Sequence, residues 1–309
     1  MRALSALTSR PLNVQGKYFS MSKRSSSTDI SVCSGSRLIL GLVFSGIISL
    51  LAYRRRSLSR SGVPGAMATG TLTFGLGGLS WALALIFFFV SSSLLSHFRE
   101  REKVSTAADK FSKGSQRDLV QVLANGGVAT AMAFGYGLSR QTATRRVIEA
   151  GYIGALATAN ADTWSTELGV LNTQPPRLIT TGKRVAAGTS GGISPLGTAA
   201  TAGGALAQGL VFKLLQPTTS AFMPLIALVS GLTGSLFDSL LGATVQAIYY
   251  CPLCQKETER RIHNCGTRTT PLRGLAWMNN DVVNFLATLF GALMAILLAL
   301  PLQHRKTRL

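Results

Sequence analysis

Residues 38–53 read LILGLVFSGIISLLAY, an apolar run that is closed directly by Arg54, Arg55 and Arg56. A hydrocarbon core of about 30 Å takes roughly 20 apolar residues in one helix, and somewhat fewer where the helix ends are protected. The run is therefore long enough for a membrane-spanning helix, and the three arginines mark its end at a membrane surface.

Similar apolar runs follow to the end of the chain. The stretch from 62 to 96 is longer than one crossing, so it divides into a Gly-rich segment and a Phe-rich segment. Small residues fill many of the runs, as close helix packing in lipid favours. The predicted spans are 38–53, 62–78, 79–96, 119–138, 147–161, 197–216, 221–248 and 282–302. We therefore predict an all-α integral membrane protein, a polytopic bundle of about eight transmembrane helices within a range of about six to nine.

The composition of the whole chain agrees with a membrane protein. Of 309 residues, 47% are hydrophobic and 14% are charged, and the mean hydropathy is +0.30. These values exclude the disordered, collagen-like and soluble-enzyme classes. Lys and Arg number 31 against 12 Asp and Glu, which gives a net charge of +19. In so apolar a chain we interpret the excess as a topology signal, and we expect no nucleic-acid partner.

The basic residues also predict an orientation. With eight spans both termini share one side, and the loops after the first, third, fifth and seventh spans carry 18 Lys or Arg against 13 on the other side. Residues 1–28 hold five of those 13, so the contrast is 18 against 8 without them. The positive-inside rule thus predicts that the loops after the odd-numbered spans face the cytosol, stroma or matrix, where nucleotide is present.

The first residues have the composition of an organelle leader. Residues 1–28 contain five Lys or Arg, seven Ser and no acidic residue, the first being Asp29. This fits a plastid or mitochondrial transit peptide, with a flexible basic tail as the alternative. We predict a basic leader or tail over 1–35, a membrane domain over 36–303 and a basic tail over 304–309.

Ionisable and amide side chains in or beside the spans gather toward one membrane face. Such groups cost about 2.5 to 3.5 kcal/mol each on insertion scales, so we consider them first as functional. The alternating direction of the spans places them all near the face with the basic loops. They are Asp162 and Glu167 in ANADTWSTELG, Asp238 in GLTGSLFDSLLGATVQ, Asn125 in QVLANGG, and Asn279, Asn280, Asp281 and Asn284 at the last span.

Two of these motifs predict how the carboxylates are presented. Asp162 and Glu167 are five residues apart, about 140° around a helix, so a straight helix would not point both at one spot. We expect a helix end or break near Asp162. Asp238 lies in a stripe of small residues from Gly231 to Gly242, which lets another helix approach while Asp238 points into the bundle. The alternative is a structural Asp238 paired with an interior Arg or Asn.

The loops on the same face add positive charge. Clustered carboxylates with surrounding Lys and Arg have the composition that a phosphate-bridging metal ion requires. These basic residues are Lys103, Lys113, Arg117, Lys183 and Arg184. The loop after the fifth span, LITTGKRVAAGTSGGISPLG, adds a Gly/Ser/Thr-rich stretch that can offer backbone N–H groups to a phosphate. It is neither a Walker A loop nor a GxGxxG motif, and a plain connector is the alternative.

A second local motif is CPLCQKETERRIHNC, within the loop 249–281. Cys251, Cys254, His263 and Cys265 have the spacing C-x2-C-x8-H-x-C. Three thiolates and one imidazole satisfy tetrahedral zinc in closed structural sites, so we predict a small zinc-binding loop. Such a Zn²⁺ would fold the loop and not catalyse. A disulfide and unliganded cysteines are the alternatives.

Several ordered blocks resemble one known family. ADTWSTELG, PRLITTGKRVAAGTSGGISPLG, GSLFDSLLGATVQ, the Cys/His loop and GLAWMNNDVVNF follow one another, preceded by SGVPGAMATGTLTFGLGG and KGSQRDLVQVLANGG. Over about residues 55–300 the chain resembles the membrane family long labelled domain of unknown function 92. That family includes transmembrane protein 19 and the phytyl-phosphate kinase of chloroplasts and cyanobacteria. The Cys/His loop belongs to some branches only, which leaves the isoprenoid substrate open.

The resemblance implies an integral-membrane isoprenoid-phosphate kinase. Its most direct form is a phytyl-phosphate kinase, which uses CTP or ATP to make the diphosphate for tocopherol and phylloquinone synthesis. The positions that match the family blocks are Asp162, Glu167, Lys183, Thr189, Gly191, Gly192, Ser194, Asp238, Asn280, Asp281 and Asn284.

Roles for these residues follow from the chemistry of phosphoryl transfer. We assign Asp162 and Asp238 to Mg²⁺, and Lys183 with the Gly-rich loop to the nucleotide phosphates. Lys113 or Arg117 is assigned to the lipid phosphate. Because that acceptor is already anionic, catalysis needs positioning and charge neutralisation more than a strong base. Asn125, Asn280, Asp281 and Asn284 complete the expected phosphate-binding set.

Two functions without catalysis stand beside the kinase, both on a transmembrane protein 19-like chain. A transporter predicts carboxylates spread through the membrane depth and a repeat between halves, whereas the sequence shows clustering and no clear repeat. A scaffold would bind a partner through the zinc loop. For the kinase we expect the bilayer, a nucleoside triphosphate and an isoprenyl or phytyl phosphate as partners. A plastid membrane is the expected location, with the endoplasmic reticulum or a mitochondrial membrane as alternatives.

Overall fold

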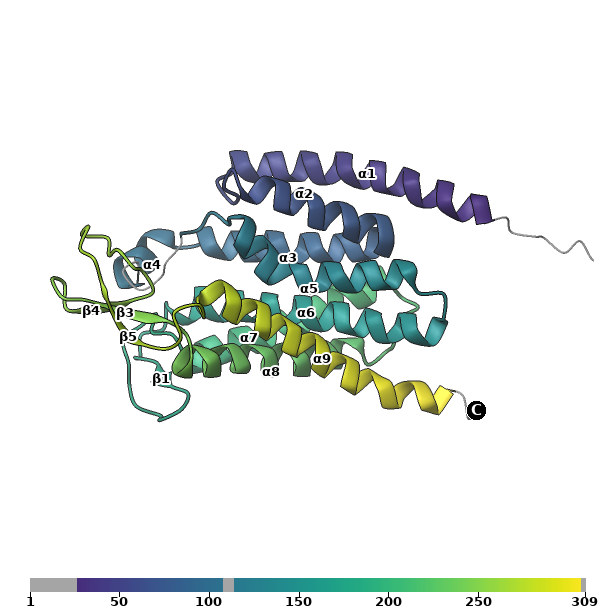
Figure 1. Cartoon of the computed structure of the whole chain (residues 1–309). Coiled ribbons are helices and arrows are strands. Elements are labelled where there is room, and N and C mark those ends of the chain that lie inside the picture. The colour runs from purple at the N-terminus through teal and green to yellow at the C-terminus, as the bar shows by residue number, and fades with distance from the viewer. Residues whose placement is uncertain (1–26, 108–113, 307–309) are drawn as a thin grey trace, which may run out of the picture.

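The protein, seen here in a computed structural model that describes residues 27–107 and 114–306, is a bundle of long helices. The helical segments lie roughly side by side and alternate in direction (Figure 1). This confirms the predicted helical, multi-pass membrane architecture. The helices are α1 (Ser27–Arg54), α2 (Gly62–Leu72), the π-helix η1 (Thr73–Gly77), α3 (Leu79–His97), α4 (Glu100–Ala107), α5 (Leu119–Leu138), α6 (Thr142–Gly169), α7 (Pro195–Leu215), α8 (Met223–Thr244) and α9 (Asn280–Lys306).

Five of the described helices are long and apolar enough to cross a membrane. They provide the spans Gly35–Arg54, Leu79–His97, Leu119–Leu138, Met223–Thr244 and Asn280–Leu302. The other three predicted spans correspond to α2 with η1, α6 and α7. A helix enclosed by other helices meets little lipid and therefore needs less apolar surface. The count of eight crossings stays a prediction.

Helix α6 forms the centre of the bundle. It packs against α3, α5, α7, α8 and α9, and every residue from 149 to 161 is buried. Small residues bring the backbones together, because a Cβ on Gly154 would lie 2.5 Å from the Gly291 carbonyl oxygen of α9. The Thr158 hydroxyl donates to the Gly154 carbonyl at 2.9 Å. This small-residue packing explains how polar positions along α6 are held in fixed places.

The predicted break in α6 near Asp162 is wrong. The helix continues through Asp162 and Glu167 to Gly169. The two carboxylates accordingly point to different neighbours: Ser235 of α8 donates to Asp162 Oδ1 at 3.2 Å, and Ser96 of α3 donates to Glu167 Oε1 at 2.6 Å. Their 140° separation is kept, and the neighbouring helices bring different partners to each side.

Helices α1 and α2 form a pair at the edge of the bundle (Figure 1). Helix α1 packs against α2 and η1, and these two pack in turn against α5. A Cβ on Gly41 of α1 would lie 3.1 Å from the Thr71 carbonyl oxygen, and the Ser45 hydroxyl contacts Thr71 Oγ1 at 2.8 Å. The Gly-rich segment from 62 to 78 is thus a close packing partner for α1.

The non-helical parts gather at one end of the bundle, where α1, α3, α6 and α8 end and α2, α5, α7 and α9 begin (Figure 1). Strands β1 (Arg177–Leu178) and β2 (Gly192–Ile193) pair in the Gly-rich loop. The segment predicted as a loop over 249–281 contains a three-stranded antiparallel sheet in the order β4–β3–β5, which we call with its turns the Cys/His module. Its strands are β3 (Ile248–Cys251), β4 (Lys256–Thr258) and β5 (Thr270–Arg273).

Two sequence predictions fall on residues that the structure does not describe. Residues 1–26 of the proposed leader over 1–35 lie outside the described residues, and α1 begins at Ser27. Lys113 also lies outside them. The division into leader, membrane domain and tail therefore stays a prediction.

Candidate functional site

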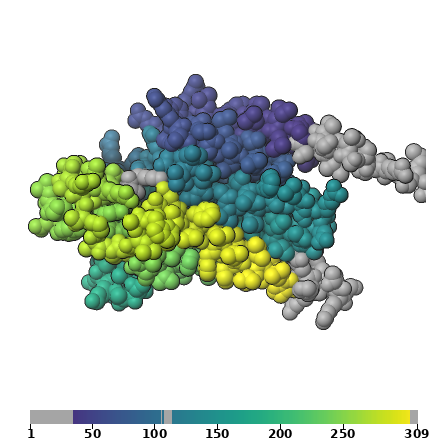
Figure 2. Space-filling view, viewed as in Figure 1, coloured from purple at the N-terminus to yellow at the C-terminus, as the bar shows by residue number. Residues whose placement is uncertain are grey.

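A polar cavity of about 370 Å³ lies at the end of the bundle where the loops gather. Side chains from α3, α4, α5, α6, α8 and α9 line it together with the Gly-rich loop and the Cys/His module, which covers this end beside the start of α9 (Figure 2). The sequence-predicted site residues that line it are Arg117, Asn125, Asp162, Glu167, Thr189, Gly191, Gly192, Ser194, Asp238, Asn280 and Asn284. Segments far apart in the chain thus share one cavity.

Acidic side chains from three elements approach one another in this cavity. Asp162 comes from α6, Asp238 from α8, and Glu259 from the Cys/His module. The negative charges of Asp162 and Glu259 are both close enough to Asp238 to repel its carboxylate. Asp238 Oδ2 is buried, and no described residue forms a hydrogen bond with it. The alternative in which an Arg or Asn pairs with Asp238 is therefore not found, and three neighbouring carboxylates favour a cation between them.

Glu259 is a cavity residue that the sequence did not reveal. It follows β4 directly, and its Oε1 accepts hydrogen bonds from Ser190 Oγ at 3.1 Å and from Gln246 Nε2 at 2.8 Å. Arg260 lines the cavity beside it. In QKETERR this glutamate is indistinguishable from a solvated loop charge, because only the fold of the module turns it toward the bundle. Gln246, just after α8, was missed for the same reason.

The four predicted zinc ligands come together in the Cys/His module. Their ligand atoms all lie within 4.8 Å of one another. The Sγ atoms of Cys251 and Cys265 are 3.7 Å apart, and Nδ1 of His263 is 3.2 Å from Sγ of Cys265. A tetrahedral site with Zn–S bonds of about 2.3 Å separates two sulfurs by about 3.8 Å. The group, which Cys254 completes, can hold one metal ion with no open position.

The module is fixed to α8 and to the Gly-rich loop. Arg273 of β5 donates to the Gly242 carbonyl at 2.8 Å and to the Ser190 carbonyl at 3.4 Å. Gly274 has a φ of +84°, and a Cβ there would lie 1.9 Å from the Gln246 carbonyl oxygen. Only glycine fits this close approach. The module is therefore a wall of the cavity.

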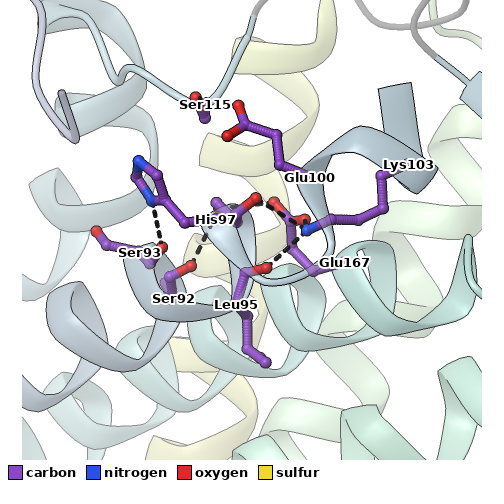
Figure 3. Close-up of polar contacts among 9 residues, drawn as sticks. Ser92, Ser93, Leu95, His97, Glu100, Lys103, Ser115 and Glu167 are labelled. Carbon is purple, nitrogen blue, oxygen red and sulfur yellow. Dashed lines mark hydrogen bonds and ion pairs between the residues drawn. The ribbon is translucent and has the colours of Figure 1, made fainter. Parts of the chain in front are cut away.

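The buried Lys103 forms an ion pair with the half-buried Glu167 at the corner between α3 and α4 (Figure 3). Lys103 Nζ also donates to the carbonyls of Leu95 at 2.6 Å and Ser96 at 2.9 Å, which places a cation at the C-terminus of α3. Glu167 Oε1 accepts from the Ser96 hydroxyl. Both carboxylate oxygens of Glu167 are thus engaged, so the geometry fits a positioning role better than the predicted catalytic one.

Arg117 points into the cavity from the loop before α5. Its Nη1 donates to Ser93 Oγ at 2.9 Å, and its guanidinium lies 5.5 Å from the ring centre of Phe89 and 5.9 Å from that of Phe88. Burial lowers the pKa of Arg117 to about 10, against the opposing charge of Glu167. The side chain therefore stays cationic near neutral pH, and an anion beside it would offset the cost of its burial.

The backbone of Arg117 is held by the segment between α1 and α2. Its N–H donates to the Ser57 carbonyl, and its carbonyl accepts from the Ser59 N–H, each at 3.0 Å. A Cβ on Gly62 would lie 2.2 Å from the Arg117 carbonyl oxygen. The predicted family block SGVPGAMATG thus places the arginine, although it contributes no side chain to the polar cavity.

The Gly-rich loop packs against α8. Gly191 has a φ of +84°, and a Cβ there would lie 2.5 Å from that of Ala243. The N–H groups of Thr189 and Gly192 bond within the loop, to the carbonyls of Ala186 at 3.2 Å and Thr189 at 2.9 Å. These two amides are therefore engaged, and two of the predicted phosphate donors are not available.

Three helix N-termini at this end add positive potential. Each begins with a side chain that accepts from the backbone N–H three residues later: Ser194 before α7 at 3.1 Å, Asp118 before α5 at 2.9 Å, and Asn279 before α9 at 3.1 Å. The aligned peptide dipoles of a helix favour an anion near its first turn. The cavity therefore combines a carboxylate cluster with cationic and dipolar groups.

Two predicted phosphate-binding residues do not line the cavity. Lys183 is exposed in the turn of the Gly-rich hairpin, next to Gly182 with a φ of +67°, and it lies outside the set of lining residues. Asp281 is buried in the first turn of α9 and is also absent from that set. The structure therefore does not bring Lys183 to the carboxylates, and its assignment to nucleotide phosphates stays a prediction.

Comparison with known proteins agrees with the family resemblance. The chain matches the family described as integral membrane protein DUF92 over residues 43–292. Protein PGR of Arabidopsis thaliana is 33% identical over 279 residues, which cover 84% of this chain and 94% of the relative. An uncharacterized membrane protein of Methanocaldococcus jannaschii is 29% identical over 266 residues, covering 85% and 94%.

A third relative extends the family to chloroplasts. Protein VTE6, chloroplastic, of Arabidopsis thaliana is 26% identical over 249 residues, which cover 78% of this chain and 65% of the relative. No solved structure matches the chain. The match covers the helices and loops that surround the polar cavity, and the chain therefore belongs to the DUF92 family of integral membrane proteins.

Proposed function

We propose that the protein is an integral-membrane isoprenoid-phosphate kinase. The acceptor is phytyl phosphate or a related prenyl phosphate, and the donor is CTP or ATP. Support comes from the family resemblance, which includes the phytyl-phosphate kinase of chloroplasts, and from the chemistry of the cavity. The observation that carries the proposal is the buried Asp238 Oδ2, which has no hydrogen-bond partner among the described residues and shares the polar cavity with Asp162, Glu259 and Arg117.

The reaction needs only one phosphorus–oxygen exchange. An oxygen of the acceptor phosphate attacks the γ-phosphorus of the nucleotide, the bond to the β-phosphate oxygen breaks, and the nucleoside diphosphate leaves with the electron pair. The acceptor oxygen is anionic near neutral pH, so no strong base is required. The protein's task is to hold two anionic groups close together, and this explains why cations and helix N-termini surround the cavity.

The carboxylate cluster fits a magnesium site. Magnesium ions take oxygen ligands from one or two carboxylates and from substrate phosphates. We assign Asp162 and Asp238 to the ion, with Glu259 near them as a third acidic group. Bound Mg²⁺ would neutralise the charge of the nucleotide phosphates. Asp238 Oδ2 supports this assignment, since it is buried without a hydrogen-bond partner among the described residues, and an unsatisfied carboxylate oxygen is costly.

The two phosphate groups have separate candidate positions. We assign the acceptor phosphate to Arg117, because its side chain is half-buried and lines the cavity. The nucleotide phosphates are assigned to the N-terminus of α7 and to Arg260, which also line the cavity. Asn280 and Asn284 on α9 add neutral hydrogen-bonding groups. This arrangement lets the acceptor reach a nucleotide held at the carboxylates.

The metal of the Cys/His module is proposed to be zinc. Three thiols and one imidazole suit Zn²⁺, and the sulfur spacing of 3.7 Å fits tetrahedral coordination. We propose that this ion folds the module and thereby places Glu259. This role also differs from that of a partner-binding scaffold, since Glu259 and Arg273 connect the module to the bundle.

The proposed cellular setting is a plastid membrane, with the endoplasmic reticulum or a mitochondrial membrane as alternatives. A relative that is named as chloroplastic and the basic composition of residues 1–28 support this choice. The orientation predicted from the basic loops would put the polar cavity on the side with the excess of Lys and Arg, where nucleotide is available. The isoprenoid acceptor would reach the protein from the surrounding bilayer.

A direct assay tests the kinase function. The full chain, purified in lipid nanodiscs, is given Mg²⁺, radiolabelled CTP or ATP, and phytyl, geranylgeranyl or farnesyl phosphate. We expect label in the prenyl diphosphate for at least one pair of substrates, and none with Asp238→Asn. No diphosphate from any pair, under conditions in which another kinase of the family is active, would refute the function.

A further inference from the structure

A second, apolar cavity lies between the α1–α2 pair and α3. It has a volume of about 260 Å³, and aromatic and aliphatic side chains form nearly all of its wall. Helices α1 and α2 close one side, α3 closes the other, and α5 contributes the edge nearest the polar cavity. Representative lining residues are Phe44, Ile48, Phe74, Leu83, Ile86 and Phe89.

Two hydroxyl groups in this wall are already bonded to backbone carbonyls of their own helices. The Thr69 hydroxyl donates to the Gly65 carbonyl at 3.0 Å, and the Ser45 hydroxyl to the Gly41 carbonyl at 2.6 Å. Such hydroxyls offer little to a polar ligand. The interior therefore favours a hydrocarbon.

The apolar cavity is elongated along the axes of helices α1 and α3. Its lining residues on α1 run from Gly41 to Ala52, which is about 16 Å at 1.5 Å per residue. Those on α3 run from Leu79 to Phe89, about 15 Å by the same measure. A long, narrow, apolar space suits a linear hydrocarbon chain better than a compact solute.

The two cavities meet at a short polar boundary. Arg117, Gln121 and Asn125 line both of them, and they are spaced four residues apart at the start of α5. The Arg117 guanidinium lies over the rings of Phe88 and Phe89, which line the apolar cavity, and Arg117 also lines the polar cavity together with the carboxylates. A molecule with a phosphate at one end and a hydrocarbon at the other matches this arrangement, in which a polar cavity adjoins an apolar one.

From this geometry we infer that the apolar cavity binds the hydrocarbon chain of the isoprenoid phosphate, while Arg117 binds its phosphate at the boundary between the cavities. This inference rests on the proposed function for the identity of the ligand. It adds the position of the chain, its direction and the helices that contact it. The terminal isoprene unit would lie toward Gly41 and Leu79, away from the carboxylates.

Gly126 offers a sharp test of this position. It is buried on α5 and lines the apolar cavity, and a Cβ there would meet no atom within 4 Å, so it points into open space. The neighbouring Gly127 also has no atom within 4 Å of a Cβ but lines neither cavity. Gly126→Leu should therefore fill the tail site, and Gly127→Leu is its matched control.

Binding is measured without nucleotide, so that it does not depend on turnover. The full chain in nanodiscs is irradiated with farnesyl phosphate that carries a diazirine at its terminal isoprene unit, and adducts are mapped by mass spectrometry. We expect adducts on the lining residues of α1, α2 and α3. Labelling should fall about tenfold or more in Gly126→Leu and stay near the wild-type level in Gly127→Leu. Adducts on the exposed faces of α3, such as Val90 and Leu94, would overturn the inference, as would equal labelling of the two variants.

Competition separates the tail from the phosphate. Unlabelled phytyl phosphate should abolish the adducts, inorganic phosphate should have no effect, and phytol should compete at least about tenfold more weakly. If phytol competes as well as phytyl phosphate, the assignment of the phosphate to Arg117 is wrong. Specific adducts in a protein that forms no diphosphate would refute the kinase but keep the tail site. Diphosphate formation without adducts on these helices would refute the tail site alone.

Discussion

The Ser190 hydroxyl donates a hydrogen bond to Glu259 Oε1 over 3.1 Å, and this contact joins the Gly-rich loop to the Cys/His module. Gln246 holds the same carboxylate oxygen from the end of α8. A glutamate more than 20 residues beyond Asp238 is thereby kept beside it. The position of the third acidic group thus depends on a module outside the helical bundle, which makes the folding of that module a condition for the site.

Loss of one module ligand should reduce both metal content and activity. Cys254→Ser removes a thiolate from the four-ligand group, so we expect loss of about one zinc per chain, measured by inductively coupled plasma mass spectrometry. Kinase activity should fall about tenfold or more because Glu259 loses its fixed position. Cys33→Ser, at a cysteine in α1, is the control and should keep both.

Glu259→Gln separates the metal from the carboxylate. This variant keeps the Cys and His ligands, so we expect a full zinc content together with reduced activity and a higher Mg²⁺ requirement. Full activity in Glu259→Gln would show that the carboxylate has no part in the reaction. In that case, any loss in Cys254→Ser would have to come from the module's fold alone.

Asp238→Asn should abolish activity while leaving the fold intact. The amide keeps the shape of the side chain but removes a buried negative charge that has no hydrogen-bond partner at Oδ2 among the described residues. We expect kcat to fall about 100- to 1,000-fold, as for loss of a group that stabilises transition-state charge. The melting temperature in nanodiscs should stay equal or rise, because an uncompensated buried charge is lost. A lower melting temperature would indicate a structural Asp238 instead.

The Lys103–Glu167 pair should act mainly on stability. Lys103→Met leaves the Glu167 charge without its buried partner, which costs about 3 kcal/mol. Restoring neutrality in Lys103→Met/Glu167→Gln should recover part of this loss. Unfolding in mixed micelles, followed by circular dichroism, gives the coupling energy. The exposed Arg99–Glu102 pair is the control, and its removal should cost less than about 1 kcal/mol.

Lys183 and Arg117 should differ clearly when they are replaced. Lys183 is exposed and lies away from the cavity lining, so Lys183→Ala should change KM for the nucleotide less than about threefold. Arg117→Met should raise KM for the prenyl phosphate about tenfold or more, since charge-assisted hydrogen bonds are worth about 1.5 to 3 kcal/mol. Steady-state kinetics with both substrates varied will test this. A large effect at Lys183 would mean that the hairpin closes over the nucleotide during the reaction.

The helices could be predicted because each depends on local composition. The run 79–96 became Leu79–His97, and 119–138 was reproduced in full, since Asp118 forms a capping box with Gln121 directly before the apolar residues. The predicted span 147–161 is shorter than α6, which begins five residues earlier and ends eight residues later. Its polar ends remain helical because neighbouring helices supply partners, and single-sequence hydropathy contains no such information.

The carboxylates and amides of the site could be predicted for a different reason. An acidic residue in or beside an apolar span is costly, so Asp162 and Asp238 are conspicuous in the sequence itself. Glu259 lies in a polar segment where charge is ordinary, and only the folded module brings it to the cavity. Lys103 was expected among the basic residues of this face, but its pairing with Glu167 at the α3–α4 corner could not be predicted from the sequence. Lys183 is the opposite case, because it is close in sequence to the Gly-rich loop residues that line the cavity but does not line the cavity itself.

The contact between Gly62 and Arg117 has a consequence for genetics. A methyl group at position 62 would collide with the carbonyl oxygen of Arg117, 55 residues later in the chain. A random mutagenesis screen should therefore recover inactive alleles at this glycine as readily as at the carboxylates, although it touches no substrate. A map of such alleles along the gene would identify the packing contacts that position Arg117, and it would show that the α1–α2 pair is required for the proposed activity.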